Sequence, residues 1–383
     1  MKKKLRQYLK MIVQNFILPA FYRLFCIQRI RTGLVVFADG HSVARPERMN
    51  RLFEGLNNDQ SGKDAEGKAF YEIAEWYHDF QAMSYISALC KMLGFMKIYA
   101  RANYVVISDN FLPVASCNKR KGTFVIQLWH GCGAFKRFGY DTADDIPEDY
   151  VGNVFKNYDI VPVSGDKSVE PFTSAMKLHK GVCIPIGVSA TDQYYDKEYK
   201  EKCKGDFYRI CPEARGKKIL LWAPTFRGMA ASPVICGEEI FKNAANRLSD
   251  EWYVIIKYHP HMEAKGKKST IELPTERLLP VTDILVTDYS SIIFNYSIFQ
   301  RPVLLFAPDL DEYSDMRGFY LNYHELPGEL VKTEDELFEG ICNAEDMFDI
   351  NEMQRFYEEY MGGCDGNATK RLIDIMSTKR YRS

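Results

Sequence analysis

The stretch Thr123-Phe-Val-Ile-Gln127-Leu-Trp129-His130-Gly131 joins an apolar run to a histidine and a glycine. Phe124 to Leu128 has the length and composition of a buried strand. His130 therefore stands at a strand end, where open α/β sheets bind their ligands. A neutral imidazole there can accept a proton near pH 7, and Gly131 allows the backbone to approach a substrate closely. The alternative is a structural histidine in a turn, but three comparable strand ends later in the chain favour a functional one.

Apolar, strand-like runs alternate with helical stretches along the chain. The expected strands are Thr32–Ala38, Tyr104–Ser108, Thr123–Leu128, Ile160–Val163, Val182–Ile186, Lys218–Ala223, Trp252–Tyr258, Ile284–Thr287 and Pro302–Ala307. The expected helical regions include Pro46–Met96, Gly237–Leu248 and Ser291–Phe299. This alternation is typical of α/β proteins with parallel sheets.

A polar stretch from Asp192 to Arg215, rich in Lys, Asp and Tyr, separates two such series. A chain of 383 residues is long enough for two or three domains. We therefore expect a GT-B type fold, with two Rossmann-like domains that face each other across a cleft. The expected divisions are a basic, apolar N-terminal helical segment over 1–31, an N-terminal acceptor domain over 32–195, and a C-terminal donor domain over 196–383.

Composition narrows the function classes. The net charge is -1, so no overall field favours nucleic acid as a partner. The ten cysteines show neither CxxC pairs nor the spacing of zinc ligands. That pattern predicts reduced thiols in a cytosolic protein and disfavours a disulfide framework.

The N-terminus differs from the rest of the chain. Residues 1–31 carry eight Lys and Arg residues and no acid, with many large apolar side chains between them. The uncharged part, Met11 to Tyr22, is 12 residues long and too short to span a bilayer. We expect this segment to lie on an anionic membrane surface. The alternative is a first helix that packs on the protein.

Three strands of the second half also end in groups that bind anions. The groups that follow these strands are Thr225 and Arg227, then Lys257, His259 and His261, then the helix-starting pair Ser290 and Ser291. Free amides at a helix N-terminus bind phosphate, and nearby cations and hydroxyls add to that attraction. The serine pair alone is equally explained as a helix cap, but three such ends of one sheet predict a phosphate site.

A metal site is not expected. Asp309-Leu-Asp311 matches the DxD pattern of metal-dependent transferases, and His259 with His261 resembles a chelating pair. No third ligand stands at a useful spacing from the two histidines. The predicted histidine and helix-terminus site needs neither a metal nor a cofactor.

The motifs together resemble the CDP-glycerol glycerophosphotransferases of teichoic acid and capsule synthesis over roughly residues 100–375. The motifs that carry the resemblance are Trp129-His130-Gly131 with Lys136 and Asp141, Ala223-Pro-Thr225-Phe-Arg227, His259-Pro260, Thr287-Asp288-Tyr-Ser290-Ser291, Arg301-Pro302, Tyr313, Arg317-Gly-Phe-Tyr320, Asp365-Gly366 and Arg371.

The resemblance implies transfer of glycerol phosphate from CDP-glycerol to a hydroxyl of an undecaprenyl-diphosphate-linked acceptor, with release of CMP. It implies that His130 is the base and that His259, with Ser290, Ser291 and Arg227, holds the diphosphate. It also places Trp129, Gly131, Lys136, Thr225, Asp288 and Arg317 among the substrate-binding residues. The enzyme would work as a peripheral protein at the cytoplasmic face of the membrane.

The chain departs from the family pattern in two places. Val188–Asp192 keeps a Thr-Asp pair but lacks an arginine common in the family, and Cys132-Gly133-Ala134 replaces a commoner Thr-Pro-Leu. The acceptor and the polyol therefore stay open, with CDP-ribitol as an alternative donor. A GT-B glycosyltransferase and a catalytically idle membrane partner are the other hypotheses. The length favours a priming or short-chain enzyme over a long-chain polymerase.

Overall fold

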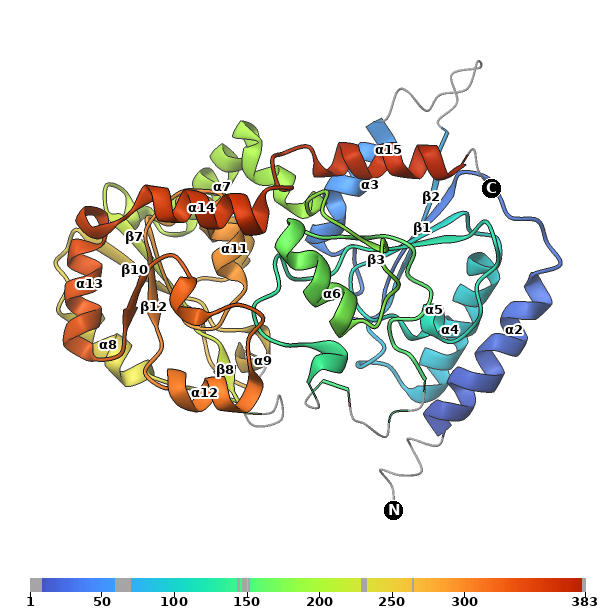
Figure 1. The fold of residues 1–383 in the computed structure, drawn as a ribbon, viewed down its shortest axis with the longest axis horizontal. Coiled ribbons are helices and arrows are strands. Elements are labelled where there is room, and N and C mark those ends of the chain that lie inside the picture. The colour runs from blue at the N-terminus through green and yellow to red at the C-terminus, as the bar shows by residue number, and fades with distance from the viewer. Residues whose placement is uncertain are drawn as a thin grey trace. The chain divides into compact units, whose positions relative to one another are not determined.

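The computed structural model describes residues 9–58, 70–142, 145–146, 150, 152–228, 233–263 and 265–380, except the side chains of residues 260–261, 315–317 and 379–380. The chain forms two compact units (Figure 1). Unit 1 comprises Met1–His130, Gly139–Asp192 and Gly363–Ser383, and unit 2 comprises Gly131–Phe138 and Gln193–Gly362.

Unit 1 is built on a parallel sheet of four strands in the order β2-β1-β3-β4. A parallel bridge from Ile126 to Ile160 links it to the short pair β5-β6. The strands are β1 (Leu34–Asp39), β2 (Glu72–Tyr77), β3 (Tyr104–Ile107), β4 (Phe124–Gln127), β5 (Val161–Pro162) and β6 (Cys183–Ile184). Every residue of β1 and β3 is buried, as expected for parallel strands with helices on both faces.

Helices cover both faces of this sheet. They are α2 (Leu18–Phe25), α3 (Asn50–Asn58), α4 (Tyr85–Tyr99), α5 (Leu112–Ala115), α6 (Val169–Ala175) and α15 (Ala368–Arg380). Leu52 and Leu56 of α3 pack with Leu372 and Met376 of α15 against Val35, Phe37 and Val106. On the other side α2 lies along α4 (Figure 1).

Unit 2 contains a parallel five-stranded sheet in the order β10-β7-β11-β12-β13. The strands of unit 2 are β7 (Lys218–Ala223), β8 (Phe226–Arg227), β9 (Val234–Ile235), β10 (Trp252–Ile256), β11 (Ile284–Thr287), β12 (Val303–Phe306) and β13 (Glu329–Val331). Its helices are α7 (Lys197–Ile210), α8 (Glu238–Asn246), α9 (Pro260–Glu263), α10 (Thr275–Leu278), α11 (Ile292–Ser297), α12 (Leu310–Arg317), α13 (Glu334–Met347) and α14 (Ile350–Met361).

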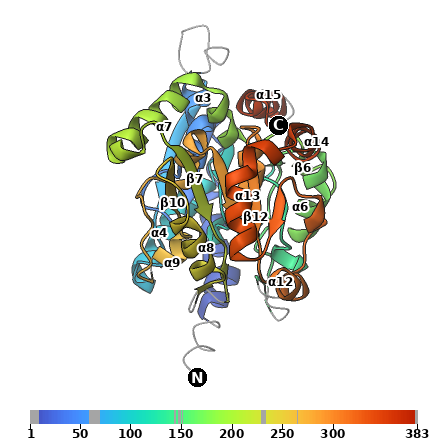
Figure 2. The same ribbon diagram turned by 90° about the vertical axis from the view of Figure 1, so that its left-hand side faces the viewer.

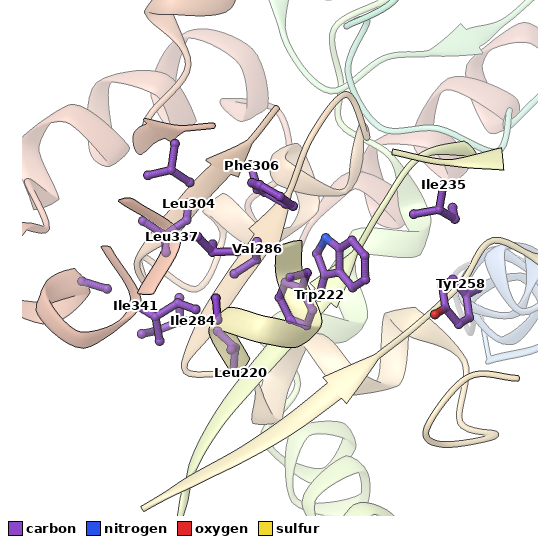
Figure 3. Close-up of a cluster of buried hydrophobic side chains, with 14 of the residues drawn as sticks. Leu220, Trp222, Ile235, Tyr258, Ile284, Val286, Leu304, Phe306, Leu337 and Ile341 are labelled. Carbon is purple, nitrogen blue, oxygen red and sulfur yellow. The ribbon is translucent and has the colours of Figure 1, made fainter. Parts of the chain in front are cut away.

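Helices α8 and α13 cover one face of this sheet (Figure 2). The Phe241 ring of α8 stacks on the Trp222 ring of the sheet at 4.0 Å between centroids. Leu220, Val286 and Leu304 belong to the same cluster of buried apolar side chains (Figure 3). Helix α13 starts at a capping box, in which the Thr333 hydroxyl accepts from the Glu336 amide while Glu336 accepts from the Thr333 amide. The alternating apolar runs of the sequence thus form the core.

The α/β fold with two parallel sheets is confirmed, and all nine expected strands are present within a residue or two of their expected bounds. Four of the named strands were not predicted: β2, the short antiparallel pair β8 and β9, and β13. Strand β2 lies inside the region expected to be helical. It is an edge strand whose Glu72 is exposed and whose other side chains are mostly half-buried, so its sequence lacks the apolar run that marks a buried strand. Strand β13 has only three residues.

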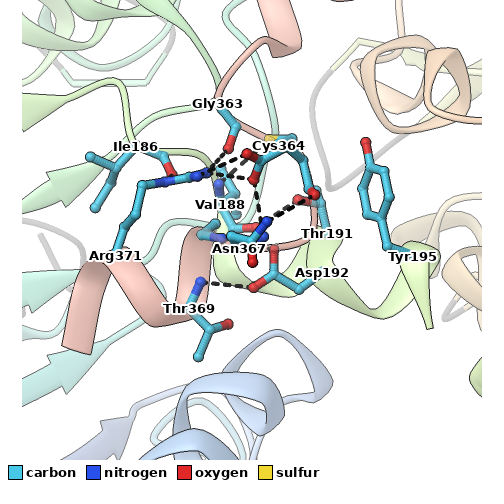
Figure 4. A network of polar contacts seen from close by, with 12 residues as sticks. Ile186, Val188, Thr191, Asp192, Tyr195, Gly363, Cys364, Asn367, Thr369 and Arg371 are labelled. Carbon is cyan, nitrogen blue, oxygen red and sulfur yellow. Dashed lines mark hydrogen bonds and ion pairs between the residues drawn. The ribbon is translucent and has the colours of Figure 1, made fainter. Parts of the chain in front are cut away.

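The C-terminal segment corrects the expected domain bounds. Residues 363–383 were expected in the C-terminal domain, but Gly363–Ser383 belongs to unit 1. The Arg371 guanidinium donates to the backbone carbonyls of Ile186 and Gly363 and to the Asp365 carboxylate. Asp192 accepts from the amides of Ala368 (3.1 Å) and Thr369 (2.7 Å) and so caps α15 (Figure 4).

These contacts give several motif residues a structural role. Asp192, Asp365 and Arg371 fasten α15 to the segment after β6. Gly187 fits beside Gly363 with a φ of +84°, and an added Cβ would lie 2.0 Å from the Gly363 carbonyl oxygen. Only glycine allows this close approach.

The N-terminal segment is a helix with two different faces over its described residues. Leu18 and Tyr22 are fully buried, and the Tyr22 hydroxyl accepts from the Arg120 amide at 3.1 Å. Phe16 and Leu24 are 69% and 65% exposed. In the part of the chain that the structure covers, no helix has the length and apolar character needed to cross a bilayer. Lys2, Lys3, Lys4 and Arg6 lie outside the described residues.

Candidate functional site

His130 follows β4 at the carboxyl edge of the unit 1 sheet, and its side chain is 45% exposed. The preceding Trp129 has a φ of +58°, which is rare for a bulky residue and marks a strained turn. The turn is held because the Trp129 amide donates to the buried Gln127 Oε1 at 2.9 Å. The Trp129 ring stacks on the His130 ring at 4.2 Å between centroids and also packs against Phe155.

Asp109 is the partner of His130, and the sequence prediction missed it. Its Oδ2 lies 3.5 Å from His130 Nδ1. Asp109 follows β3, the neighbour of β4, so the two strand ends bring these residues together. Gln127 Nε2 donates to the Asp109 carbonyl at 3.2 Å and to the Tyr158 hydroxyl at 3.0 Å. The buried side-chain amide of Gln127 therefore holds both the turn that carries Asp109 and the turn that carries Trp129.

The electrostatics favour a neutral His130. Partial desolvation at the sheet edge lowers the pKa of its imidazole, the Asp109 carboxylate opposes that shift, and Arg48 and His41 lower the pKa further. A carboxylate beside Nδ1 favours the tautomer that carries its proton on Nδ1. Nε2 is then left with a lone pair, so the imidazole can act as a general base near pH 7.

Strand β1 supplies further polar groups to the same sheet edge. Asp39 is 2% exposed and accepts from the His41 amide at 2.7 Å. The Ser108 hydroxyl donates to Asp39 at 3.3 Å. The same strand-end logic that singled out His130 would have found Asp39, His41 and Asp109, since each stands at or just past the end of an apolar run.

The residues after His130 belong to unit 2. Gly133 has a φ of +73°, and an added Cβ would lie 2.4 Å from the Phe294 ring. The Phe135 ring stacks on Phe319 at 5.1 Å, and Lys136 forms an antiparallel bridge with Phe319. Gly131 and Lys136 therefore share unit 2 with the strand-end residues of its sheet.

In unit 2 the ends of β7 and β11 are joined by Asp288, which is 3% exposed. One carboxylate oxygen, Oδ1, accepts from the amides of Thr225 at 2.8 Å and Tyr289 at 2.6 Å. The other oxygen pairs with Arg227 Nη1 at 2.9 Å. Asp288 therefore shapes the turns in which Thr225, Ser290 and Ser291 lie.

Arg227 is held from several sides. Its Nε and Nη2 donate to Asp309 at 2.7 and 2.9 Å, and Nη1 also donates to the Thr225 carbonyl. The Arg227 Cζ lies 4.7 and 4.9 Å from the centroids of the Tyr289 and Tyr313 rings. Burial disfavours the charge, but the Asp309 hydrogen bonds and the two carboxylates outweigh it and raise the pKa of Arg227. The guanidinium ties three strand ends together.

The predicted serine pair stands where expected. Ser291 is the N-cap residue of α11 but makes no capping hydrogen bond with its side chain, and the Ile292 amide donates to Ser290 Oγ at 3.4 Å. Both serine side chains are half-buried. The strand order β10-β7-β11 places this pair, Thr225 and His259 after adjacent strands.

His259 is exposed, its ring lies 5.1 Å from the Phe226 ring, and its carbonyl accepts from the Met262 amide at 2.8 Å. The side chains of Arg317 and His261, both named from the sequence, lie outside the described part of the structure. Among the described residues no three His, Cys, Asp or Glu side chains form a group that could hold a metal ion. The carboxylate oxygens of Asp309, the first residue of the DxD pattern, accept from Arg227 and Tyr289.

A family model described as CDP-glycerol:poly(glycerophosphate) glycerophosphotransferase matches residues 20–377. The chain is 28% identical to the teichoic acid ribitol-phosphate primase of Bacillus spizizenii, over 98% of both chains. It is 31% identical to the teichoic acid glycerol-phosphate primase of Bacillus subtilis, over 71% of this chain and 73% of that one.

Among solved structures, the wall teichoic acid polymerase TagF aligns with a TM-score of 0.74 and 18% identity, over 100% of this chain and 97% of that chain. This likeness concerns the fold. The family model spans nearly the whole chain and includes both strand-end sites. The chain belongs to the CDP-glycerol:poly(glycerophosphate) glycerophosphotransferase family.

Proposed function

We propose that this polyol-phosphate transferase moves glycerol phosphate from CDP-glycerol to a hydroxyl of a lipid-linked saccharide or polyol-phosphate acceptor in teichoic acid or capsular polymer synthesis. The observation that carries the proposal is His130 at a strand end with Asp109 Oδ2 lying 3.5 Å from its Nδ1. A histidine poised in this way can take the proton of an attacking hydroxyl.

In the proposed reaction the acceptor oxygen attacks the phosphorus that bears glycerol, while His130 Nε2 takes the hydroxyl proton. The bond from that phosphorus to the bridging oxygen breaks, and CMP leaves with the bonding electrons. His259, Ser290, Ser291 and Thr225 would hold the diphosphate as charge moves onto CMP. Trp129, Gly131, Lys136 and Arg317 are further substrate-binding candidates, and no metal or cofactor has a part.

Arg227 and Asp288 enter this proposal mainly as the residues that shape the donor site. Each donor nitrogen of Arg227 already has an oxygen partner. A phosphate would therefore share this guanidinium with Asp288 and Asp309. The positive charge still lies beside the Thr225 turn and adds to the local field.

CDP-ribitol is the second candidate donor. It is favoured by the similarity to the ribitol-phosphate primase, which extends over 98% of both chains. The higher percentage identity to a glycerol-phosphate primase favours glycerol. The two polyols differ in length by two hydroxylated carbons, so the discrimination depends on side chains around the polyol.

The test is incubation of the full chain with CDP-glycerol, CDP-ribitol or a UDP-sugar, each with a lipid-linked disaccharide acceptor, in parallel with the His130→Ala variant. Chromatography identifies the released nucleotide, and mass spectrometry gives the mass added to the acceptor. We expect CMP and a gain of one or more glycerol phosphate units. CMP release from CDP-ribitol alone would transfer the proposal to ribitol, and nucleoside diphosphate release from the UDP-sugar would favour a glycosyltransferase. Nucleotide release at the level of His130→Ala in every reaction would refute the proposal.

We also propose that the enzyme works as a peripheral protein on the cytoplasmic face of the membrane. The exposed apolar side chains of the N-terminal helix and its basic residues support this location. An anionic surface attracts such a segment and buries its apolar side chains.

A further inference from the structure

A cavity of about 790 Å³ lies within unit 1, at the carboxyl edge of its sheet. This volume falls within the range of roughly 300–1,000 Å³ that is usual for small-molecule sites. Leu9 and Val13 of the N-terminal helix form one wall, Leu89 and Met92 of α4 form another, and Phe111, at the start of α5, also lines the cavity. The walls named here are apolar.

Polar residues also line this cavity, and His41, one of them, acts electrostatically on the candidate base His130. The others include Gln81 and Asn110. Gln81 Nε2 lies 3.4 Å from His41 Nδ1, and Asn110 directly follows Asp109, the partner of His130. A ligand with an apolar body and a polar head could therefore fill the cavity and present its head toward His130.

The rim of the cavity carries large apolar side chains that stay in solvent. Leu9, Tyr85 and Ile86 line the cavity and are 54%, 74% and 78% exposed. Ile12 and Phe16, at 48% and 69% exposed, extend the patch along the helix. Contiguous exposed apolar side chains mark surfaces that bind a partner.

Charge narrows the chemistry of that partner. Lys10 lines the cavity, and the part of the N-terminal helix beside it carries no acid. A lysine at the opening of an apolar cavity fits an amphiphile with a phosphate head and a hydrocarbon tail. The exposed apolar side chains at this opening would let such a tail pass from a membrane surface into the cavity.

We propose that this cavity binds the hydrocarbon chain of the lipid-linked acceptor, with the lipid phosphate at Lys10 and the reacting end toward His130. The proposal rests on the proposed function for the identity of the acceptor. It adds a lipid-chain site within unit 1, so that substrate selection depends on chain length as well as on the saccharide.

The first experiment measures binding without any donor nucleotide. Calorimetry of the full chain with n-alkyl phosphates of four to twelve carbons, below their micelle concentrations, gives the affinity for each chain length. We expect Kd to fall about tenfold for every two methylenes and to level off once the cavity is full. Inorganic phosphate serves as the control for the head alone. Binding that is independent of chain length, or that keeps strengthening without a plateau as on an open surface, would overturn the proposal.

Two variants alter the cavity. Ala88→Phe places a ring into it from α4, where Ala88 is 7% exposed, and Leu89→Gln makes its wall polar. Each variant should raise the Kd of dodecyl phosphate at least tenfold and leave the Kd of butyl phosphate unchanged. Ile350→Gln replaces an exposed apolar residue of unit 2 and should match the wild type. Thermal unfolding checks that each variant is folded, and a folded Leu89→Gln protein with unaltered dodecyl phosphate affinity would refute the site even if Ala88→Phe fails to fold.

The kinetic readout separates this proposal from the proposed function. With an active donor, both cavity variants should raise the KM of a long-chain acceptor about tenfold and leave a soluble, short-chain acceptor unchanged. Loss of CMP release with intact chain-length-dependent binding would refute the proposed function alone. Normal CMP release with equal KM values for long and short chains would refute the lipid site alone.

Discussion

The orientation and the pKa of the His130 imidazole depend on one carboxylate and one strained turn. The Trp129 backbone, at a φ of +58°, directs the imidazole out from the sheet edge, and Asp109 lies 3.5 Å from its Nδ1. Burial favours the neutral ring, and the Asp109 charge keeps the pKa from falling further. Both effects suit the role of general base that we propose for it.

We predict that His130→Ala lowers the transfer rate by about 10²–10⁴-fold, because the acceptor hydroxyl loses its base. Binding of CDP-glycerol, measured by calorimetry, should be unchanged, since the base acts on the acceptor. His179→Ala, an exposed histidine of unit 1 outside the site, is the matched control. Near-normal turnover of His130→Ala would disprove the assignment.

Asp109→Asn should lower the rate by about 10–10²-fold and displace the pH profile. Asp109 raises the pKa of His130 against the effect of burial. Removal of its charge should therefore lower that pKa, and the acid limb of the pH–rate curve should move to lower pH. Asp109→Glu keeps the charge, so its acid limb should lie closer to that of the wild type. An acid limb at the same pH in Asp109→Asn would show that Asp109 does not act through His130.

Among the elements, the ends of β7, β11 and β12 are held together by a buried ion cluster. Asp288, Asp309 and Arg227 are buried or largely buried, and two tyrosine rings pack against the guanidinium. The cluster positions the turns that carry Thr225, Ser290 and Ser291. Its removal would therefore change the shape of these loops and so disturb the proposed donor site.

We predict that Arg227→Met destabilises the protein by about 3–5 kcal/mol, because two buried carboxylates lose their counter-charge. The surface pair of Lys218 and Glu345 offers a matched control. Lys218→Met should change the free energy of unfolding by less than about 1 kcal/mol. Thermal and denaturant unfolding of both variants provides the comparison, and equal stabilities would contradict a structural role for Arg227.

His259→Ala, and Ser290→Ala combined with Ser291→Ala, should weaken CDP-glycerol binding or slow CMP departure. The reason is their position after adjacent strands, beside the start of α11. Neither change removes buried packing, because His259 is exposed and both serines are only half-buried. Calorimetry with CDP and steady-state kinetics measure the two effects. Unchanged CDP affinity together with unchanged turnover would exclude these residues from the diphosphate site.

Across the molecule, the N-terminal helix combines the two alternatives that the sequence left open. Leu18 and Tyr22 pack into unit 1, as a core helix would, while Phe16, Leu24 and Ile27 remain exposed. Deletion of the segment would therefore remove core contacts as well as any membrane contact. Substitution of its exposed face separates the two effects.

We predict that Phe16→Asp combined with Leu24→Asp reduces flotation of the protein with anionic liposomes. Each apolar side chain adds roughly 1.5–3 kcal/mol of burial, and each nearby basic residue adds roughly 1 kcal/mol that fades with salt. Val234→Asp combined with Ile350→Asp, two exposed apolar residues of unit 2, is the control. Equal flotation of both double variants at low and high salt would leave the helix with a packing role alone.

The sequence by itself determined the strands, their parallel arrangement and the strand ends at which His130, Thr225 and Ser290 lie. These features depend on local apolar runs and on the rule that parallel strands end at a common edge. The tertiary structure decided which groups meet. Asp109 lies beside His130 because β3 and β4 are neighbours, and Arg227 meets Asp309 because the turns after β7 and β12 converge. The packing of α15 on unit 1 and the apolar cavity likewise join residues far apart in the chain. Such contacts follow from register and packing, which no local pattern encodes.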